Sequence, residues 1–111
     1  MIDLKKKYLN DIKTAIDKLY KHLSLLENEN EYFENITIKS AVEREFEIIG
    51  EAMSKLLKID PKIKISTPER IISMRNRLIH GYDNIDDKVV MQVVKDHIPT
   101  LKEEVNNLLE E

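Results

Sequence analysis

The sequence contains no cysteine and only 2 glycines and 3 prolines among its 111 residues. Without cysteine, the chain can form neither a disulfide scaffold nor a zinc finger, and it has no thiol nucleophile. So few glycines and prolines argue against an all-β fold, because the turns of such folds require these residues. Apolar runs are only a few residues long and none follows the basic N-terminus, so we expect neither a membrane span nor a signal peptide. A cytoplasmic protein is the default expectation.

Charged residues, by contrast, are abundant, at 35% of the chain, and hydrophobic residues make up 41%. A chain of this length fits one domain, residues 1–111, around one core. The net charge of -3 excludes a protein that coats nucleic acid through bulk positive charge. Residues 61–80, however, hold five basic residues against one acid, whereas residues 27–51 hold eight glutamates against two basic residues. This basic segment is compatible with a specific anionic partner, although solvated helix faces would give the same pattern.

Apolar residues recur every three or four positions from end to end, which is the period of an amphipathic helix. The pattern predicts helices from 4 to 26, from 37 or 38 to 58, from 67 to 80 and from 86 or 87 to 98, and a last helical piece from 101 to 109. The polar run 27–31 is predicted to be a loop. The apolar residues after it are expected to cover one end of the core: Tyr32, Phe33 and Ile36. The sequence therefore predicts an all-α, up-and-down bundle of four or five helices.

Local signals mark several positions along these helices. Gly50 lies inside the second one, where glycine costs about 1 kcal/mol relative to alanine. A close approach by another helix or by a ligand would explain this cost, and simple tolerance of the residue is the alternative. Thr67 and Pro68 predict the start of the third helix. Asp86 or Asp87 should cap the fourth, which Pro99 is expected to break or kink.

Residues 74–82 concentrate the side chains that could carry chemistry: Arg75, Asn76, Arg77, His80 and Tyr82. A guanidinium group matches two phosphoryl oxygens with its planar fork of donors and stays charged at biological pH. An imidazole can both accept and donate a proton near pH 7. Cleavage of RNA without a metal needs such a pair, because a base must take the 2′-hydroxyl proton and cations must hold the charge that grows on the phosphate.

Helix geometry limits how these side chains can meet. Asn76 and His80 are four residues apart and share a face, whereas Arg75 and His80 are five apart, about 140° around a helix. Arg75 and His80 converge only if the helix unwinds near His80, as Gly81 permits, or if a second copy of the chain contributes. Alternatively, these cations only suit the negative end of the helix dipole, and His80 is a plain C-terminal cap.

The spacing of Arg75, Asn76 and His80 resembles the signature of the HEPN superfamily, in which a polar residue follows an Arg and a His stands five to seven positions beyond that Arg. The pattern Arg75-x4-His80-x-Tyr82 resembles the narrower motif of HepT-like proteins, the toxin partners of minimal nucleotidyltransferases. Chain size, the long second helix with its segment 47–52, and the Asp-rich turn after Tyr82 extend the resemblance over essentially the whole chain.

This resemblance implies a metal-independent endoribonuclease that needs no cofactor and works as a homodimer, with both motifs in a cleft at the dimer interface. His80 would be the acid/base residue, Arg75 would hold the scissile phosphate and Asn76 would orient His80. Attack by the 2′-hydroxyl would leave a 2′,3′-cyclic phosphate and a free 5′-hydroxyl. RNA is the expected substrate, and neither DNA nor a membrane is expected as a partner.

Tyr82 has a separate implied role. In HepT-like systems the partner nucleotidyltransferase, acting as antitoxin, adds AMP to the motif tyrosine and silences the nuclease. Phosphate charge placed beside Arg75 and His80 would occupy the site meant for RNA. The alternative is that Tyr82 packs against the end of the helix.

Several other charged residues are weaker candidates. Further contacts with the RNA backbone are expected from three of them: Arg77, Lys62 and Lys64. Glu47 and Glu51 lie one turn apart, and we expect a solvated face or a salt bridge to Arg75 rather than a metal site, because no third and fourth ligand presents itself. The remaining histidines have no partner at a suitable spacing and are expected to be structural or exposed: His22 and His97.

Two other classes of function remain open beside the ribonuclease toxin. One is a non-catalytic HEPN module that binds a nucleotide or a small anion, or that helps a nucleotidyltransferase engage its substrate. The other is a helical dimer that only scaffolds. The wide apolar faces of the second and fourth helices on so small a chain independently predict a homodimer.

Overall fold

The computed structural model describes residues 3–79 and 86–111 of the chain. Within these residues the protein is all-helical, as expected, with six helices: α1 (Leu4–Leu23), α2 (Glu29–Glu34), α3 (Ile36–Ile59), α4 (Pro68–Ile79), α5 (Asp87–Asp96) and α6 (Ile98–Glu110). None of these helices combines the length and the apolarity needed to cross a membrane.

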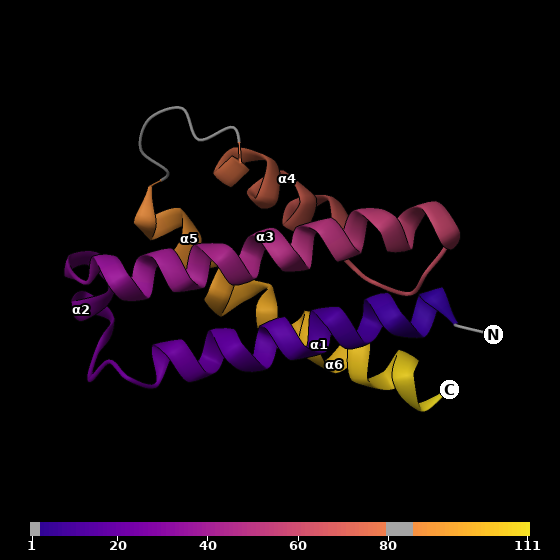
Figure 1. Cartoon of the computed structure of the whole chain (residues 1–111), viewed down its shortest axis with the longest axis horizontal. Coiled ribbons are helices and arrows are strands. Elements are labelled where there is room, and N and C mark those ends of the chain that lie inside the picture. The colour runs from indigo at the N-terminus through magenta and orange to yellow at the C-terminus, as the bar shows by residue number, and fades with distance from the viewer. Residues whose placement is uncertain (1–2, 80–85) are drawn as a thin grey trace.

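The long helix α3 is the centre of the arrangement (Figure 1). It runs antiparallel to α1, and α4 runs back along another side of it. Helix α6 contacts both α1 and α5, and the two ends of the chain lie at the same end of the elongated molecule. The molecule measures 44 × 29 × 23 Å. Helices α1, α3 and α4 therefore form a layer whose members are joined through α3.

The apolar stripe predicted for the central helix forms its buried face. All six of its members are at most 7% exposed: Ile38, Val42, Phe46, Ile49, Met53 and Leu56. Each of α1, α4, α5 and α6 adds buried apolar side chains to the same core. Burial of one such side chain is worth about 1.5–3 kcal/mol relative to leaving it exposed. Helical periodicity therefore identified the core correctly.

The predicted loop over residues 27–31 was wrong, because α2 begins inside it. The side chain of Asn28 accepts a hydrogen bond from the backbone N–H of Glu31 at 3.2 Å. The carboxylate of Glu31 in turn accepts from the backbone N–H of Glu27 at 2.9 Å. These two bonds satisfy amide donors at the start of the helix, in the manner of a capping box. A polar run thus starts a helix where the apolar pattern indicated none.

The ends of the neighbouring helices also differ from expectation. Helix α1 ends at Leu23 rather than near residue 26, and a turn follows in which the Ser24 amide donates to the Tyr20 carbonyl. Tyr32 is fully buried, as predicted, but Ile36 is 75% exposed and covers no part of the core. Ile36 is the first residue of α3, and its place there is set by Asn35, whose side chain caps the helix.

Gly50 lies against α4, in close contact with Arg75 and Ile71. A methyl group at this residue would lie only 2.7 Å from Cγ of Arg75 and 3.3 Å from the carbonyl oxygen of Ile71. The expected close approach is therefore confirmed, and the neighbour is another helix. The absence of a side chain at residue 50 lets the backbone that carries Arg75 lie against α3.

The second half of the chain follows the predicted signals. Asp86 caps α5 by accepting a hydrogen bond from the Lys88 amide. The chain breaks at His97, and α6 begins at Ile98 with Pro99 in its first turn, where the missing N–H of proline costs nothing. Proline therefore separates two helices here.

Candidate functional site

Arg75 lies on α4 and reaches toward α3, where its guanidinium group is held on two sides. Its Nη2 donates to Oε2 of Glu51 at 2.6 Å, and its Nη1 donates to Oδ1 of Asn76 at 3.0 Å. The side chain is 26% exposed, and its buried Nε has no hydrogen-bond partner among the described residues. Of the two expected possibilities, a solvated face or a salt bridge to Arg75, the structure shows the salt bridge for Glu51, whereas Glu47 pairs with Arg44.

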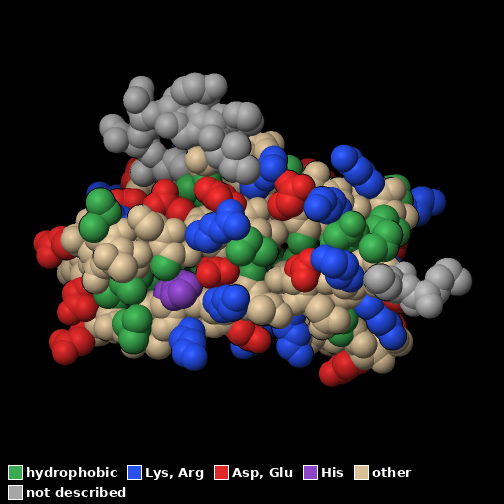
Figure 2. Space-filling view, in the orientation of Figure 1, with side chains coloured by type: hydrophobic (Ala, Val, Ile, Leu, Met, Phe, Trp, Pro, Cys, Tyr) green, Lys and Arg blue, Asp and Glu red, His purple; other side chains and the backbone are tan. Residues whose placement is uncertain are grey.

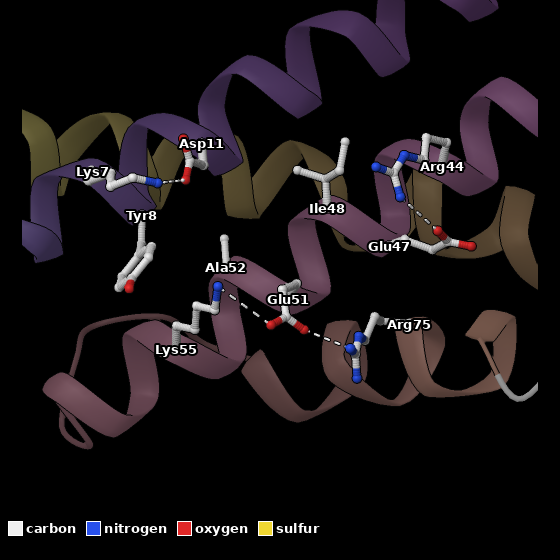
Figure 3. Close-up of a pocket in the computed structure, with 10 residues that line it drawn as sticks. All are labelled: Lys7, Tyr8, Asp11, Arg44, Glu47, Ile48, Glu51, Ala52, Lys55 and Arg75. Carbon is white, nitrogen blue, oxygen red and sulfur yellow. Dashed lines mark hydrogen bonds and ion pairs between the residues drawn. The ribbon is translucent and has the colours of Figure 1, made fainter.

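This ion pair lies at a cavity of about 300 Å³ between α1, α3 and α4 (Figure 3). Ten residues line it: Lys7, Tyr8 and Asp11 of α1, Arg44, Glu47, Ile48, Glu51, Ala52 and Lys55 of α3, and Arg75 of α4. Seven of them are charged, and the other three are Tyr8, Ile48 and Ala52. The cavity thus suits a ligand that combines charged groups with an apolar part.

The lining cations outnumber the carboxylates by four to three. Lys7 is paired with Asp11 at 2.9 Å, and Arg44 is paired with Glu47 at 3.2 Å. Glu51 pairs with both remaining cations, Arg75 and Lys55. Its Oε2 lies 2.6 Å from Nη2 of Arg75, and its Oε1 lies 3.6 Å from Nζ of Lys55. The lining therefore keeps one net positive charge, on the cations that share Glu51.

Opposite charges alternate across this face of the molecule (Figure 2). Blue and red side chains are interspersed over α1 and α3, and no broad patch of one sign covers them. Such a surface attracts polyanions weakly at long range. Recognition of an anion here would depend on specific groups in the cavity.

Tyr8 supplies the aromatic part of the cavity wall. Its ring is half-buried, and two ammonium groups lie near it: Nζ of Lys7 at 5.3 Å and Nζ of Lys55 at 5.8 Å from the ring centroid. Both distances are within the range of cation–π attraction.

Three other predicted site residues, Arg77, Lys62 and Lys64, do not line this cavity. Arg77 lines a separate hollow of about 30 Å³ on another side of α4, together with Arg70. Lys62 and Lys64 are exposed in the connector before α4 and do not line the cavity. The structure therefore places Arg75 apart from these three candidate RNA contacts.

His80 and Tyr82 lie outside the described residues. The prediction that His80 and Arg75 converge, and the role predicted for Tyr82, stay predictions. Asn76 was expected to orient His80, and within the described residues its amide oxygen accepts a hydrogen bond from Arg75.

Sequence reasoning missed part of the cavity lining. On α3 the signal was present, since Arg44, Ile48, Glu51 and Lys55 follow one another at spacings of four, three and four and so fall on the same helix face. Tyr8 carried no such signal, because α1 meets α3 only through tertiary packing. Within residues 3–79 and 86–111, no group of three or more acidic or histidine side chains could hold a metal ion.

The two other histidines are placed as structural residues. Nε2 of His22 lies 3.0 Å from Oε2 of Glu45, a residue of α3 that is only 6% exposed. His97 is half-buried at the junction of α5 and α6 and makes no side-chain cap hydrogen bond there. Neither residue lines the cavity.

Comparison with known proteins gives a consistent result. The family model described as Ribonuclease HepT-like matches residues 12–108. "Putative RNase MJ1216" of Methanocaldococcus jannaschii is 34% identical over 96% of this chain and 88% of its own length. "Putative RNase MJ0125" of the same organism is 33% identical over 96% of this chain and 91% of its own length. "Probable ribonuclease HepT" of Thermococcus cleftensis is 35% identical over 87% of this chain and 88% of its own length.

No solved structure matches the chain. The family model and these relatives nevertheless cover α3, α4 and the segment 74–82, which carry the site. The chain belongs to the HepT-like ribonuclease family.

Proposed function

We propose that this protein is an endoribonuclease that cleaves RNA by attack of the ribose 2′-hydroxyl, without a metal. Arg75 holds the scissile phosphate, and His80 is the acid/base residue. The observation that carries the proposal is the position of Arg75, at a cavity that keeps one net positive charge, in a chain of the HepT-like ribonuclease family. The ribonuclease names of the relatives support the same activity.

Each group has a defined part in the reaction. The imidazole of His80 takes the proton of the 2′-hydroxyl, and the bond from O2′ to phosphorus forms while the bond from phosphorus to O5′ breaks. A proton from the imidazole then goes to O5′, so that a 2′,3′-cyclic phosphate and a 5′-hydroxyl result. Arg75 stabilises the negative charge that grows on the phosphoryl oxygens, for which its two-pronged donor geometry is suited.

In this mechanism RNA can bind Arg75 only by displacing Glu51. Because its carboxylate neutralises Arg75 at 2.6 Å, RNA phosphate must compete with it for the guanidinium group. The competition is feasible because the side chain of Glu51 is 45% exposed, and an open ion pair of this kind is worth only about 1 kcal/mol or less. Asn76 keeps a hydrogen bond to the other guanidinium nitrogen and so fixes the orientation of Arg75.

We further propose that the protein is the toxin of a toxin–antitoxin pair, acts in the cytoplasm, and is silenced when a partner nucleotidyltransferase adds AMP to Tyr82. The sequence pattern of Arg75, His80 and Tyr82 supports this, as does a relative named for HepT. AMP on Tyr82 adds a phosphate two residues beyond His80. That charge would compete with RNA for the same cations.

We also propose a homodimer in which the cleft between subunits brings two motifs together. Large apolar side chains that remain exposed on the single chain support it: Leu4, Leu25, Ile36 and Ile59. Light scattering at micromolar concentration should give twice the chain mass of 13.1 kDa. A mass equal to that of one chain would contradict the dimer.

The nuclease proposal is tested by incubating purified, unmodified protein with total RNA in EDTA, in the absence of any antitoxin. Wild-type protein should cleave, and His80→Ala should lose at least about 100-fold of the rate, the usual contribution of acid–base catalysis. His97→Ala is the control because it lies outside the cavity, whereas His22 contacts a buried carboxylate and would confuse loss of folding with loss of chemistry. The products should carry 2′,3′-cyclic phosphate ends.

Equal cleavage by all three proteins would indicate a contaminating nuclease and contradict the proposal. Binding of RNA or nucleotide without any cleavage would favour the non-catalytic module instead.

A further inference from the structure

We propose that the α1 side of the cavity is a nucleotide subsite, in which a base of single-stranded RNA stacks on Tyr8 and the attached phosphate binds Lys55. The inference rests on the proposed ribonuclease function, because Arg75 lines the same cavity. It adds a binding element from α1, a helix that lies outside the Arg–His–Tyr motif.

The first support is the partial burial of the Tyr8 ring and the position of two cations beside it. The ring packs against the core and is half-buried, so its position is fixed while part of it remains accessible from the cavity. Lys7 and Lys55 place ammonium groups 5.3 and 5.8 Å from its centroid. An aromatic ring beside such cations is the combination that binds single strands, since bases stack on the ring and phosphates contact the cations.

The second support is the distribution of charge around Lys55. Glu51 lies 2.6 Å from Arg75 but 3.6 Å from Lys55, so its carboxylate is committed mainly to Arg75. Lys7 is neutralised by Asp11 at 2.9 Å. Among the described contacts, Lys55 is therefore the least neutralised cation of the cavity lining, and its Nζ lies 5.8 Å from the centroid of the Tyr8 ring.

The third support is the order of these groups in space. Along the cavity wall, Lys55 stands between Tyr8 and Glu51, and Arg75 lies beyond Glu51 (Figure 3). This order assigns the scissile phosphate to Arg75, the neighbouring phosphate to Lys55 and that nucleotide's base to Tyr8. A cavity of about 300 Å³ is at the lower end of the volumes of small-ligand sites, which fits one nucleotide.

The chain offers a matched control for this arrangement. Tyr20 is also half-buried on α1, and Nζ of Lys102 lies 5.4 Å from its ring centroid. This second tyrosine–lysine pair is not part of the cavity. Substitution of Tyr20 therefore shows the general effect of removing a tyrosine from α1. Any further effect of substituting Tyr8 is specific to the subsite.

The test measures binding of a fluorescent single-stranded oligouridylate to His80→Ala protein, which leaves the RNA uncut. In that background Tyr8→Leu should weaken binding about ten-fold, the effect of losing one stacked base. Tyr8→Phe, which keeps the ring, and Tyr20→Leu, the matched control, should each stay within about two-fold of the parent, since neither removes a stacking surface from the cavity. Thermal melting of each variant verifies that it is folded.

The phosphate part is tested by salt dependence. Lys55→Gln should reduce the slope of log affinity against log salt concentration by about 0.7, the value for one phosphate contact with a single strand. Lys102→Gln should leave the slope unchanged. An equal loss for both lysines would overturn the assignment of Lys55.

The stacking part is tested with a ribose phosphate oligomer that carries no bases. On this probe Tyr8→Leu should bind as well as the parent, because no base remains to stack. The subsite is wrong if Tyr8→Leu binds oligouridylate as tightly as the parent, or if it weakens the base-free oligomer equally. Failure of the ribonuclease proposal is seen separately, as absence of His80-dependent cleavage, because these binding measurements require no cleavage.

Discussion

Two of the four glutamates of helix α3, six residues apart, pair with different neighbouring helices and differ in their burial. Glu45 faces α1, is 6% exposed and meets Nε2 of His22 at 3.0 Å. Glu51 stands at the cavity, with its side chain 45% exposed, and pairs with Arg75 of α4. The two bases are similarly exposed, His22 at 29% and Arg75 at 26%, so the pairs differ in their carboxylates. We call the first pair closed because the carboxylate of Glu45 is buried, and the second pair open because that of Glu51 is partly exposed to solvent.

The two carboxylates also differ in whether water or another ion could replace their present partner. The second carboxylate oxygen of Glu45 is buried without a hydrogen-bond partner among the described residues, so loss of His22 would leave the whole group unsatisfied. Breaking a buried pair is costly for this reason, whereas an open pair exchanges partners for water or another ion at little cost. Exposure therefore makes the first pair structural and leaves the second able to accept a phosphate.

The largest expected effect concerns the open pair. Arg75→Ala should lower the rate of RNA cleavage by about 100-fold or more, as removal of one group that stabilises transition-state charge typically does. Arg75→Lys should restore only part of the rate, because an ammonium group lacks the planar fork. Cleavage assays with Arg70→Ala, an exposed arginine of the same helix outside the cavity, provide the control. Equal losses at both positions would contradict a specific role for Arg75.

The closed pair should respond in stability. His22→Ala leaves the Glu45 carboxylate buried without its partner, which should cost about 1–3 kcal/mol of unfolding free energy in urea denaturation. The cleavage rate of the folded fraction should not change. Adding Glu45→Met, which removes the stranded charge at similar volume, should recover much of the loss. A cost below about 0.5 kcal/mol would show that this pair is no more closed than an ordinary surface pair.

A smaller effect is expected from Glu51→Gln. The substitution frees Arg75 and raises the net charge of the cavity lining by one, so binding of a short RNA should tighten by about three-fold, corresponding to an open pair worth roughly 0.6 kcal/mol. The turnover number should change little, because bound phosphate has already displaced Glu51 from Arg75 and Asn76 still orients the guanidinium group. Kinetics that separate kcat from KM would show this split. Weaker RNA binding by the variant would mean that Glu51 does not compete with phosphate.

The smallest effect concerns Glu43, a carboxylate of α3 that is neither closed nor fully open. Its partial burial raises its pKa above the usual 4.5, and the negative charge of Asp87 raises that pKa further. The folded state therefore binds this proton more tightly than the unfolded state does. The resulting stability is fully present below pH 4.5 and is lost as the pH rises through the raised pKa.

Glu43→Gln should accordingly melt at a higher temperature than wild type at pH 7 and at the same temperature near pH 3.5. Glu103→Gln, at an exposed position of α6, is the control and should show no such difference. A stabilisation that is equal at both pH values would contradict the assignment to ionisation.

Local patterns predicted most of the helical architecture. The six-residue stripe of α3, an acidic cap at residue 86 or 87 and a helix break near Pro99 were all predicted, because period and capping depend on residues a few positions apart. Helix α2 was missed, although its signal, Asn28 with Glu31 three positions later, was also local. The prediction followed the absence of apolar residues and overlooked the capping chemistry.

The sequence predicted those parts of the site that depend on nearby residues, and it did not predict contacts between helices. The pairing of Glu51 with Arg75 was one of two possibilities that the sequence offered, because each residue carries a charge on a recognisable helix. Tyr8 with Lys55, and His22 with Glu45, could not be paired from sequence. The members of these pairs are separated by 47 and 23 residues, and no local rule fixes how far one long helix is rotated or shifted against the next.

The sequence by itself determined where the helices lie, which of their faces are apolar, and that the segment 74–82 holds the groups suited to RNA chemistry. The tertiary structure decided which charges remain available, because burial and partner choice depend on contacts between helices distant in sequence. Gly50 is an example of both. Its cost to the helix is a local property of the sequence, whereas the close packing of α4 against α3, which brings Arg75 to Glu51, exists only in the folded molecule. Helical periodicity is a property of the chain, whereas the neutralisation of a charge is a property of the packed molecule.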